Sequence, residues 1–193
     1  SAEEKLSPRR GQEGLSLPES FTELPAGLLR HVVTLAECET VSLASYWGGM
    51  AAEELPKIHG KFIPNQGIFF FEPYTRIHPK EDNLVHEIDE NSRYRDQIAL
   101  FGRALQEKIM NLKVFLVGAG ALGCEHLKIW SLMGVGCGPE GKIILVDDDK
   151  IEISNLSRQL LFRGSDVGQN KSVVAARAVR EINEAINVET KEM

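Results

Sequence analysis

The sequence predicts an α/β fold with a Rossmann-like parallel sheet, incomplete in this chain and preceded by a mainly helical segment. Two short apolar runs rich in β-branched residues, KVFLVG at 113–118 and KIILVD at 142–147, indicate buried strands. Between them lie a glycine-rich turn and a helical pattern from about Ala121 to Met133. Strands that alternate with helices in this way are typical of a parallel α/β domain.

The same alternation continues toward the end of the chain. A helix is expected from Asn170 to about Ile186, and NVET at 187–190 then begins a third strand. The apolar stripe expected on this helix consists of Val174, Ala178, Ile182 and Ala185. Since an open sheet of this kind needs more strands, we expect the chain to be a fragment that stops within its domain.

The residues before the first strand have a different pattern. Residues 1–23 are expected to form a flexible linker, because their first twenty are rich in Glu, Arg, Pro, Gly and Ser. Two helices are expected to follow, from Leu24 to about Glu39 and from Thr40 to about Lys57. Gly48 and Gly49 in the second helix cost about 1 kcal/mol each relative to Ala, which is tolerable if another backbone packs closely against them. The expected apolar face of this helix is formed by Leu43, Trp47, Met50, Ala51 and Leu55.

Three more segments lead up to the first strand. GIFFFEP at 67–73 indicates a buried strand that Pro73 ends. The polar, acidic residues from His78 to Glu90 are expected to form a loop or linker, and residues from Arg93 to about Met110 a helix broken at Gly102.

Composition argues against several classes of partner. The 193 residues carry a formal net charge of -6 and show no basic patch, so we expect no nucleic acid partner. No apolar run approaches the roughly 18 residues that a membrane-spanning helix needs, so we expect no membrane partner. Cys38, Cys124 and Cys137 lack paired spacing, which is typical of a reducing compartment and argues against a zinc site. The histidines show no ligand spacing, and no metal site is expected within the chain.

The turn after the first strand carries the main chemical signal. VGAGALG places Gly118, Gly120 and Gly123 in a GxGxxG spacing between a strand and a helix. The first glycine allows a tight turn, the second lets a phosphate approach the backbone, and the third lets the helix pack on the strand. The helix that begins at Ala121 offers free N–H groups to an anion. Asp147 ends the second strand, where a ribose ligand is expected, so the motif predicts an adenosine nucleotide without distinguishing ATP from NAD.

The polar connection that follows, residues 147–172, separates these alternatives. Lys171 lies near the start of a helix, where its positive charge opposes the helix dipole, and a bound anion would remove this conflict. The alternative is an exposed lysine whose unfavourable position costs little free energy. Arg158 is a second candidate partner for phosphates. Asn155 and Gln159 could orient phosphates or a carbonyl oxygen, or could serve in capping and turns. Cations with an asparagine suit a triphosphate whose α-phosphorus is attacked by a carboxylate, a reaction that needs positioning and charge stabilisation.

These motifs together resemble a known family. VGAGALGCE, the Asp-x-Asp at 147–149, SNLSRQLLFR and the later Lys-Ser are similar to the active adenylation domain of ubiquitin-activating enzymes, which have a ThiF/MoeB-type adenylation fold. CGPEGKI around Cys137 resembles the eukaryotic enzymes in particular. YWGGMAAEELPKIHGKFIPNQGIFFFEP is similar to the end of the inactive adenylation half that precedes the active one.

The resemblance implies a role for each matching residue. Arg158 and Lys171 match the catalytic cations that stabilise the adenylation transition state, and Asp147 matches the ribose ligand. The matching ATP-binding residues are Gly118, Ala119, Gly120, Gly123, Asp147, Asp149, Asn155, Arg158, Gln159 and Lys171. Asp96 departs from the bacterial relatives, which carry an arginine there; the active half of the fused eukaryotic enzymes also lacks that arginine.

The resemblance also implies the organisation of the chain and its partners. Residues 24–78 would be the end of the inactive adenylation domain, 79–90 a linker, and 91–193 the N-terminal half of the active domain. The implied function is ATP-dependent adenylation of ubiquitin or a ubiquitin-like protein, then thioester transfer, with a ubiquitin-conjugating enzyme as a further partner. A cytoplasmic and nuclear location is implied, as is Mg²⁺ whose ligand lies beyond Met193. The fragment alone is expected to be inactive. The alternatives are an NAD-dependent oxidoreductase and a non-catalytic adenylation-like scaffold.

Overall fold

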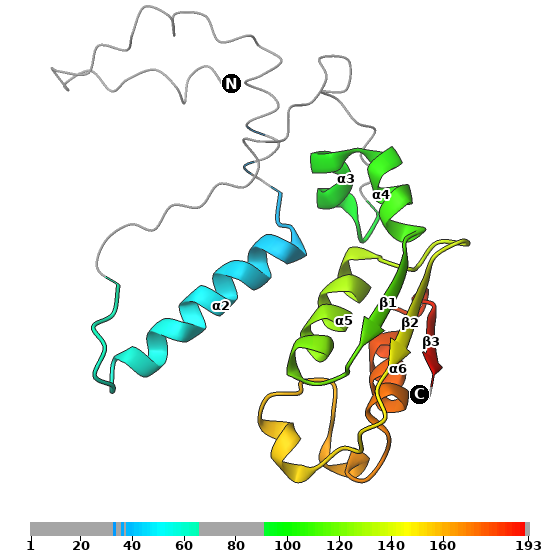
Figure 1. Ribbon diagram of the computed structural model, residues 1–193. Coiled ribbons are helices and arrows are strands. Elements are labelled where there is room, and N and C mark those ends of the chain that lie inside the picture. Colours follow the sequence, from blue (N-terminus) through cyan, green and yellow to red (C-terminus); the bar gives the residue numbers. More distant parts are fainter. Residues whose placement is uncertain (1–32, 34–35, 37, 66–90, 192–193) are drawn as a thin grey trace, which may run out of the picture.

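The computed structural model describes Val33, Ala36, residues 38–65 and residues 91–191 of the chain (Figure 1). These residues form an upstream helix, two short helices, and an α/β unit. The elements are α2 (Val41–Lys57), α3 (Arg95–Phe101), α4 (Arg103–Met110), β1 (Lys113–Val117), α5 (Ala121–Met133), β2 (Lys142–Val146), the 3-10 turns η4 (Ile153–Ser157) and η5 (Gly164–Asp166), α6 (Lys171–Ile182) and β3 (Val188–Lys191). None of the described helices is long and apolar enough to cross a membrane.

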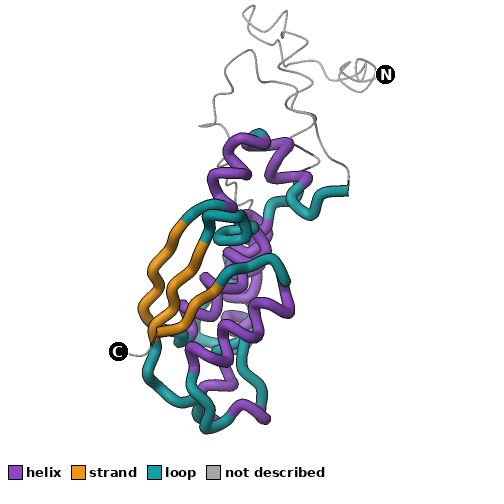
Figure 2. Tube along the Cα trace, turned by 90° about the vertical axis from the view of Figure 1, so that its right-hand side faces the viewer, coloured by secondary structure: helices purple, strands orange, loops and turns teal. Residues whose placement is uncertain are grey.

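The three strands form one parallel sheet in the order β1-β2-β3. Helices α5 and α6 connect successive strands and lie on the same side of the sheet, which Figure 2 shows edge-on. Leu127 of α5 and Val174 and Val179 of α6 pack there in one buried cluster with Ile143 and Leu145 of β2. This arrangement confirms the predicted parallel α/β fold, because the two apolar runs form strands β1 and β2 and the predicted helical segments form α5 and α6, which cover the sheet.

The opposite face of the sheet carries apolar side chains that the described residues leave exposed. Phe115 and Val117 of β1 are 64% and 62% exposed, whereas the alternate residues Val114 and Leu116 pack against the buried cluster. This alternation is a consequence of the two-residue period of a strand, which points neighbouring side chains to opposite faces.

The predicted bounds of the α/β elements are confirmed except at one end. The helix expected to reach Ile186 ends at Ile182, because Asn183 leaves the helix with φ -146° and ψ 106°. Its buried side-chain amide then donates to the carbonyl of Ser131 at 2.8 Å and to the hydroxyl of Tyr94 at 2.9 Å. The expected apolar stripe is therefore wrong at Ala185, which lies beyond the helix and is exposed.

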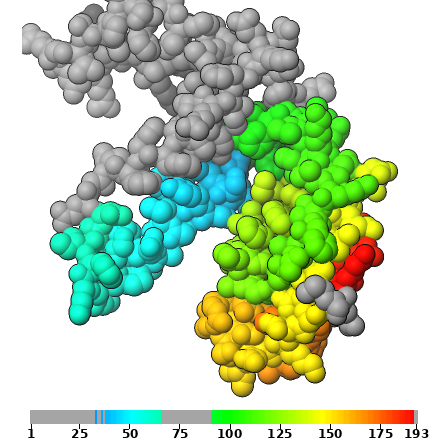
Figure 3. Space-filling model, in the orientation of Figure 1, coloured from blue at the N-terminus to red at the C-terminus, as the bar shows by residue number. Residues whose placement is uncertain are grey.

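Helix α2 confirms the second upstream helix, with Thr40 as its N-cap. An added Cβ at Gly48 or Gly49 would meet no atom within 4 Å, so the described structure shows no close backbone packing that would offset the cost of these glycines. No residue of α2 is buried, and Figure 3 shows its far end, toward Lys57, standing clear of α5. Of the helix expected at 24–39, Val33 and Ala36 are described and helical, whereas Cys38 and Glu39 are described and lie outside a helix. The expected linkers and the strand at 67–73 lie outside the described residues.

The predicted break at Gly102 is confirmed and separates α3 from α4. Gly102 has φ 84°, a conformation that glycine adopts readily. Gln97 of α3 and Gln106 of α4 are buried and both donate to the carbonyl of Met133 at 3.0 Å, which ties the two helices to the end of α5. Asp96 accepts a hydrogen bond from the backbone N–H of Glu39 at 3.0 Å, so this carboxylate connects the segment before α2 to α3.

We expect Gly134→Ala to destabilise the fold. Gly134 ends α5 with φ 85°, and an added Cβ would lie 2.7 Å from the ring of Tyr94. The strained backbone and the contact together should cost about 1–3 kcal/mol, measured by chemical denaturation. Gly164→Ala is the matched control, because its Cβ would meet nothing within 4 Å, and it should leave stability nearly unchanged. Equal stability of the two variants would contradict the expectation.

Candidate functional site

The glycine turn between β1 and α5 has the geometry that its sequence predicts. Gly118 adopts φ 97°, which turns the chain sharply at the end of the strand. At Gly123 an added Cβ would lie 2.1 Å from the carbonyl oxygen of Gly118, so only glycine allows the helix to come this close to the turn. At Gly120 an added Cβ would meet nothing within 4 Å, so the space beside this residue is open on the described structure.

The open side of the turn coincides with the start of α5. Gly120 is the N-cap and has no side chain that could cap the helix, and the first turn of the helix contains no acidic residue. The first N–H groups of a helix lack intrahelical partners and carry the positive end of its dipole. The turn therefore presents donors to an anion.

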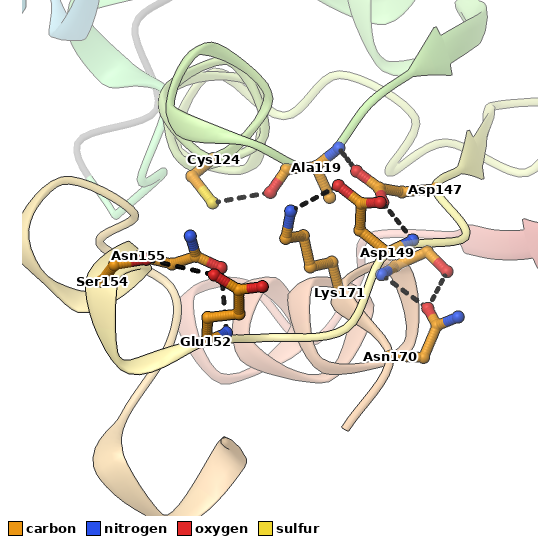
Figure 4. A network of polar contacts seen from close by, with 10 residues as sticks. Ala119, Cys124, Asp147, Asp149, Glu152, Ser154, Asn155, Asn170 and Lys171 are labelled. Atoms are coloured by element: carbon orange, nitrogen blue, oxygen red, sulfur yellow. Dashed lines mark hydrogen bonds and ion pairs between the residues drawn. The ribbon is translucent and has the colours of Figure 1, made fainter. Parts of the chain in front are cut away.

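Asp147, at the end of β2, fastens this turn to the next strand. Its Oδ2 accepts the N–H of Ala119 at 2.6 Å, and its Oδ1 accepts the N–H of Asp149 at 2.9 Å (Figure 4). Ala119 is fully buried, so its N–H would cost free energy without this acceptor. One carboxylate thus fixes both the glycine turn and the beginning of the polar connection.

Lys171, the first residue of α6, points back toward the same place. Its ammonium nitrogen lies 2.7 Å from Oδ2 of Asp149, and its side chain is only 10% exposed. Figure 4 shows the side chain rising from α6 toward the glycine turn, beneath Asp147 and Asp149. The structure therefore brings Ala119, Asp147, Asp149 and Lys171 together in one polar network. The alternative that Lys171 is merely an exposed lysine is wrong, because its side chain is almost buried.

Cys124 of α5 contacts this network through Ala119. Its thiol is fully buried and donates weakly to the carbonyl of Ala119 at 3.4 Å. Burial raises the pKa of this thiol; Asp147 acts in the same direction, and Lys171 opposes them. A raised pKa keeps the thiol neutral at physiological pH, which fits the small buried hydrophobe that the sequence predicts and not a nucleophile.

The other predicted site residues lie farther along the connection, on η4 and just after it. Asn155 is buried, and its Oδ1 accepts the N–H of Glu152 at 3.0 Å in a capping box, the local role that the sequence left open. Arg158 is exposed, and its guanidinium donates to the carbonyl of Ser154 at 2.9 Å. Neither side chain has a hydrogen bond to the glycine turn in the described structure.

Gln159 differs from its neighbours. Its side chain is 4% exposed, and its carbonyl oxygen has no hydrogen-bond partner in the described structure. A buried acceptor without a donor costs about 1–3 kcal/mol, so this oxygen is the one buried side-chain acceptor among the described residues that a further donor would stabilise.

Sequence reasoning missed two residues that shape the connection. Asp166 is buried, accepts the N–H of Arg163 at 2.8 Å and pairs with Arg177 of α6 at 2.5 Å. Asn170 caps α6 by accepting from the N–H and hydroxyl of Ser172. The local signal for Asp166 was its spacing of three residues after Arg163, which is the spacing of a capping contact.

A parallel sheet whose first strand ends in an open glycine turn, with a fixed carboxylate and a buried cation beside it, defines a Rossmann-like α/β domain, a class of fold in which this turn commonly holds the phosphates of a nucleotide. The ThiF family model matches residues 94–193, and the chain belongs to the ThiF family.

Curated relatives extend the likeness beyond the α/β unit. The chain is 48% identical over 160 residues to ubiquitin-activating enzyme E1 1 of Candida albicans, and 46% identical over 164 residues to ubiquitin-activating enzyme E1 2 of Arabidopsis thaliana. These matches cover 80% and 84% of this chain but only 16% and 15% of the relatives. A crystal structure of E. coli MccB with ATP is 34% identical, with a TM-score of 0.48 over 55% of this chain and 32% of that one.

We expect the second and third glycines of the turn to respond differently to alanine. Gly123→Ala should lower the melting temperature strongly, because its Cβ would overlap the carbonyl of Gly118. Gly120→Ala, where the space is open, should leave the melting temperature within a few degrees of the unchanged protein. Thermal denaturation followed by circular dichroism measures both. A tolerated Gly123→Ala would show that the turn does not need this close approach.

Proposed function

We propose that the protein activates ubiquitin or a ubiquitin-like protein by ATP-dependent adenylation of its C-terminus, followed by transfer to an enzyme thiol as a thioester. The observation that carries this proposal is the buried ammonium of Lys171 beside the open glycine turn that Asp147 fixes. The names of the curated relatives, ubiquitin-activating enzymes, support the choice of acyl substrate. The chain spans about a sixth of the length of these relatives, so the activity is proposed for the whole protein.

The described residues fit a triphosphate. The N–H groups at the start of α5 and the space at Gly120 suit phosphate oxygens, which only accept hydrogen bonds. Asp147 would accept from the ribose, because its lone pairs are not exhausted by two N–H donors. The unpartnered oxygen of Gln159 would accept from a donor, which the phosphates lack and which a ribose hydroxyl or a peptide N–H of the incoming tail would supply.

The chemistry proposed for this site needs little acid–base catalysis. The C-terminal carboxylate is already a nucleophile; its oxygen forms a bond to the α-phosphorus while the bond to the pyrophosphate oxygen breaks. Lys171 would stabilise the negative charge that spreads over the phosphorus centre and the departing group, and its almost buried ammonium supports this role. Arg158 would join it after leaving the carbonyl of Ser154, a contact made on the protein surface.

The remaining assignments belong to the same proposal. Residues 24–78 would be the end of an inactive adenylation domain, and 91–193 the front half of the active one. A ubiquitin-conjugating enzyme would receive the thioester. Three cysteines without paired spacing would suit the reducing cytoplasm and nucleus. Mg²⁺ would accompany ATP, but the described residues contain no group of three His, Cys, Asp or Glu side chains that could hold it alone.

Pyrophosphate exchange into ATP, measured with the full-length protein, tests the proposed function. Exchange should require ubiquitin or a ubiquitin-like protein, because the adenylate forms on that substrate. Titrations with ATP and NAD should show binding of ATP. Binding of NAD instead would favour an oxidoreductase, and binding of ATP without exchange would favour a non-catalytic scaffold.

We expect Lys171→Ala and Arg158→Ala each to slow exchange by about 10²–10³-fold, because each removes charge stabilisation from the transition state. Lys108→Ala is the matched control: it removes the same charge from the exposed surface of α4 and should leave exchange unchanged. Undiminished exchange in either site variant would remove that residue from the mechanism.

The 193-residue chain by itself is expected to catalyse no exchange, since it spans only about a sixth of the length of its curated relatives. Assay of the purified chain with ATP, Mg²⁺ and ubiquitin checks this expectation. Exchange by the chain alone would contradict it.

A further inference from the structure

The pair formed by Lys171 and Asp149 is unequal in its surroundings. The ammonium is almost buried, with its side chain 10% exposed, while the carboxylate side chain is 74% exposed. The carboxylate is therefore the outer member of the pair and the ammonium the inner one. An anion that approaches the ammonium from solvent meets the carboxylate of Asp149 beside it.

The backbone holds the two residues in this register. The N–H of Lys171 donates to the carbonyl of Asp149 at 2.9 Å, and Lys150 and Asn170 form an antiparallel bridge. Next to this bridge, the N–H of Ile151 donates to the carbonyl of Gln169, and the carbonyl of Ile151 accepts the N–H of Gly168. This short ladder places the start of the polar connection directly beside the start of α6.

Asp149 is also linked to the glycine turn. Its N–H donates to Oδ1 of Asp147, whose Oδ2 accepts the N–H of Ala119 (Figure 4). The position of the carboxylate relative to the turn is thereby determined by main-chain contacts on both sides. A lysine side chain has four rotatable bonds, and an ion pair at 2.7 Å restricts them.

We propose that Asp149 is a positioning residue for Lys171 and competes with the nucleotide phosphates for its ammonium. This inference rests on the proposed function, and it differs from the expectation that Asp149 binds ATP directly. The carboxylate and the phosphates are both anionic, so they share the one cation at a cost to phosphate affinity. In return, the ammonium is already directed toward the glycine turn when the nucleotide arrives.

Asp149→Asn separates positioning from direct binding by the sign of its effect on affinity. The amide keeps the size of the side chain and removes its charge. We expect the full-length variant to bind ATP about three- to fivefold more tightly, measured by isothermal titration without divalent metal, because the competing anion is gone. In pyrophosphate exchange, kcat and the KM for ATP should both fall, kcat by about tenfold, because Lys171 is less restricted.

Two matched variants make the result specific. Asp148→Asn removes the same charge one residue away and leaves the pair of Asp149 and Lys171 in place, so it should change ATP affinity by less than about twofold. Asp149→Glu restores the charge and should return ATP affinity toward that of the unchanged protein. The gain in affinity from Asp149→Asn should also shrink as salt is raised, because added ions screen the competition.

Weaker ATP binding by Asp149→Asn would overturn the inference and assign Asp149 to direct binding. An equal gain from Asp148→Asn would overturn it too, because the effect would then be one of net charge. A merely structural role predicts a lower melting temperature with lower affinity and is distinguished by the sign of the binding change. If the unchanged protein binds no ATP, the proposed function fails first, and this inference fails with it.

Discussion

The carboxylate of Asp147 is the contact on which the rest of the site depends. It accepts one N–H from the buried residue of the glycine turn and another from the start of the polar connection. The turn, Gly118 to Gly120, has no polar side chain of its own to hold its shape, and the connection that follows β2 is long. Because one rigid, strand-anchored carboxylate bonds both, the open helix terminus and the ammonium of Lys171 are brought to the same end of the sheet.

Buried side-chain amides connect the helices around the α/β unit. Gln97 and Gln106 close the end of α5 through the carbonyl of Met133, and Asn183 joins α6 to α5 through the carbonyl of Ser131. These buried amides satisfy carbonyl groups at helix ends, which would otherwise cost free energy away from water. They hold the helices on one side of the sheet, and the strand ends that carry the site are fixed as a result.

The polar network around Lys171 has one side exposed to solvent and one side buried in the protein. The thiol of Cys124 and the residue Ala119 are fully buried, whereas the side chain of Asp149 is 74% exposed. A cation in this position is shielded from bulk water on one side, so its interaction with an anion is stronger than at an open surface. Arg158 is exposed and donates to the carbonyl of Ser154, so its surroundings differ from those of the buried Lys171.

The sequence alone determined the strands, the helix after the glycine turn, the break at Gly102 and the identity of the polar residues, because these follow from local periodicity and turn chemistry. It could not determine where α6 ends, since Asn183 leaves the helix for partners 52 and 89 residues away in the chain. Nor could it show that Lys171 is buried against Asp149, or that Asn155 is engaged in a capping box while Gln159 keeps an unpartnered oxygen. Those outcomes depend on which segments meet in space, and only the folded backbone brings residues 149 and 171 side by side.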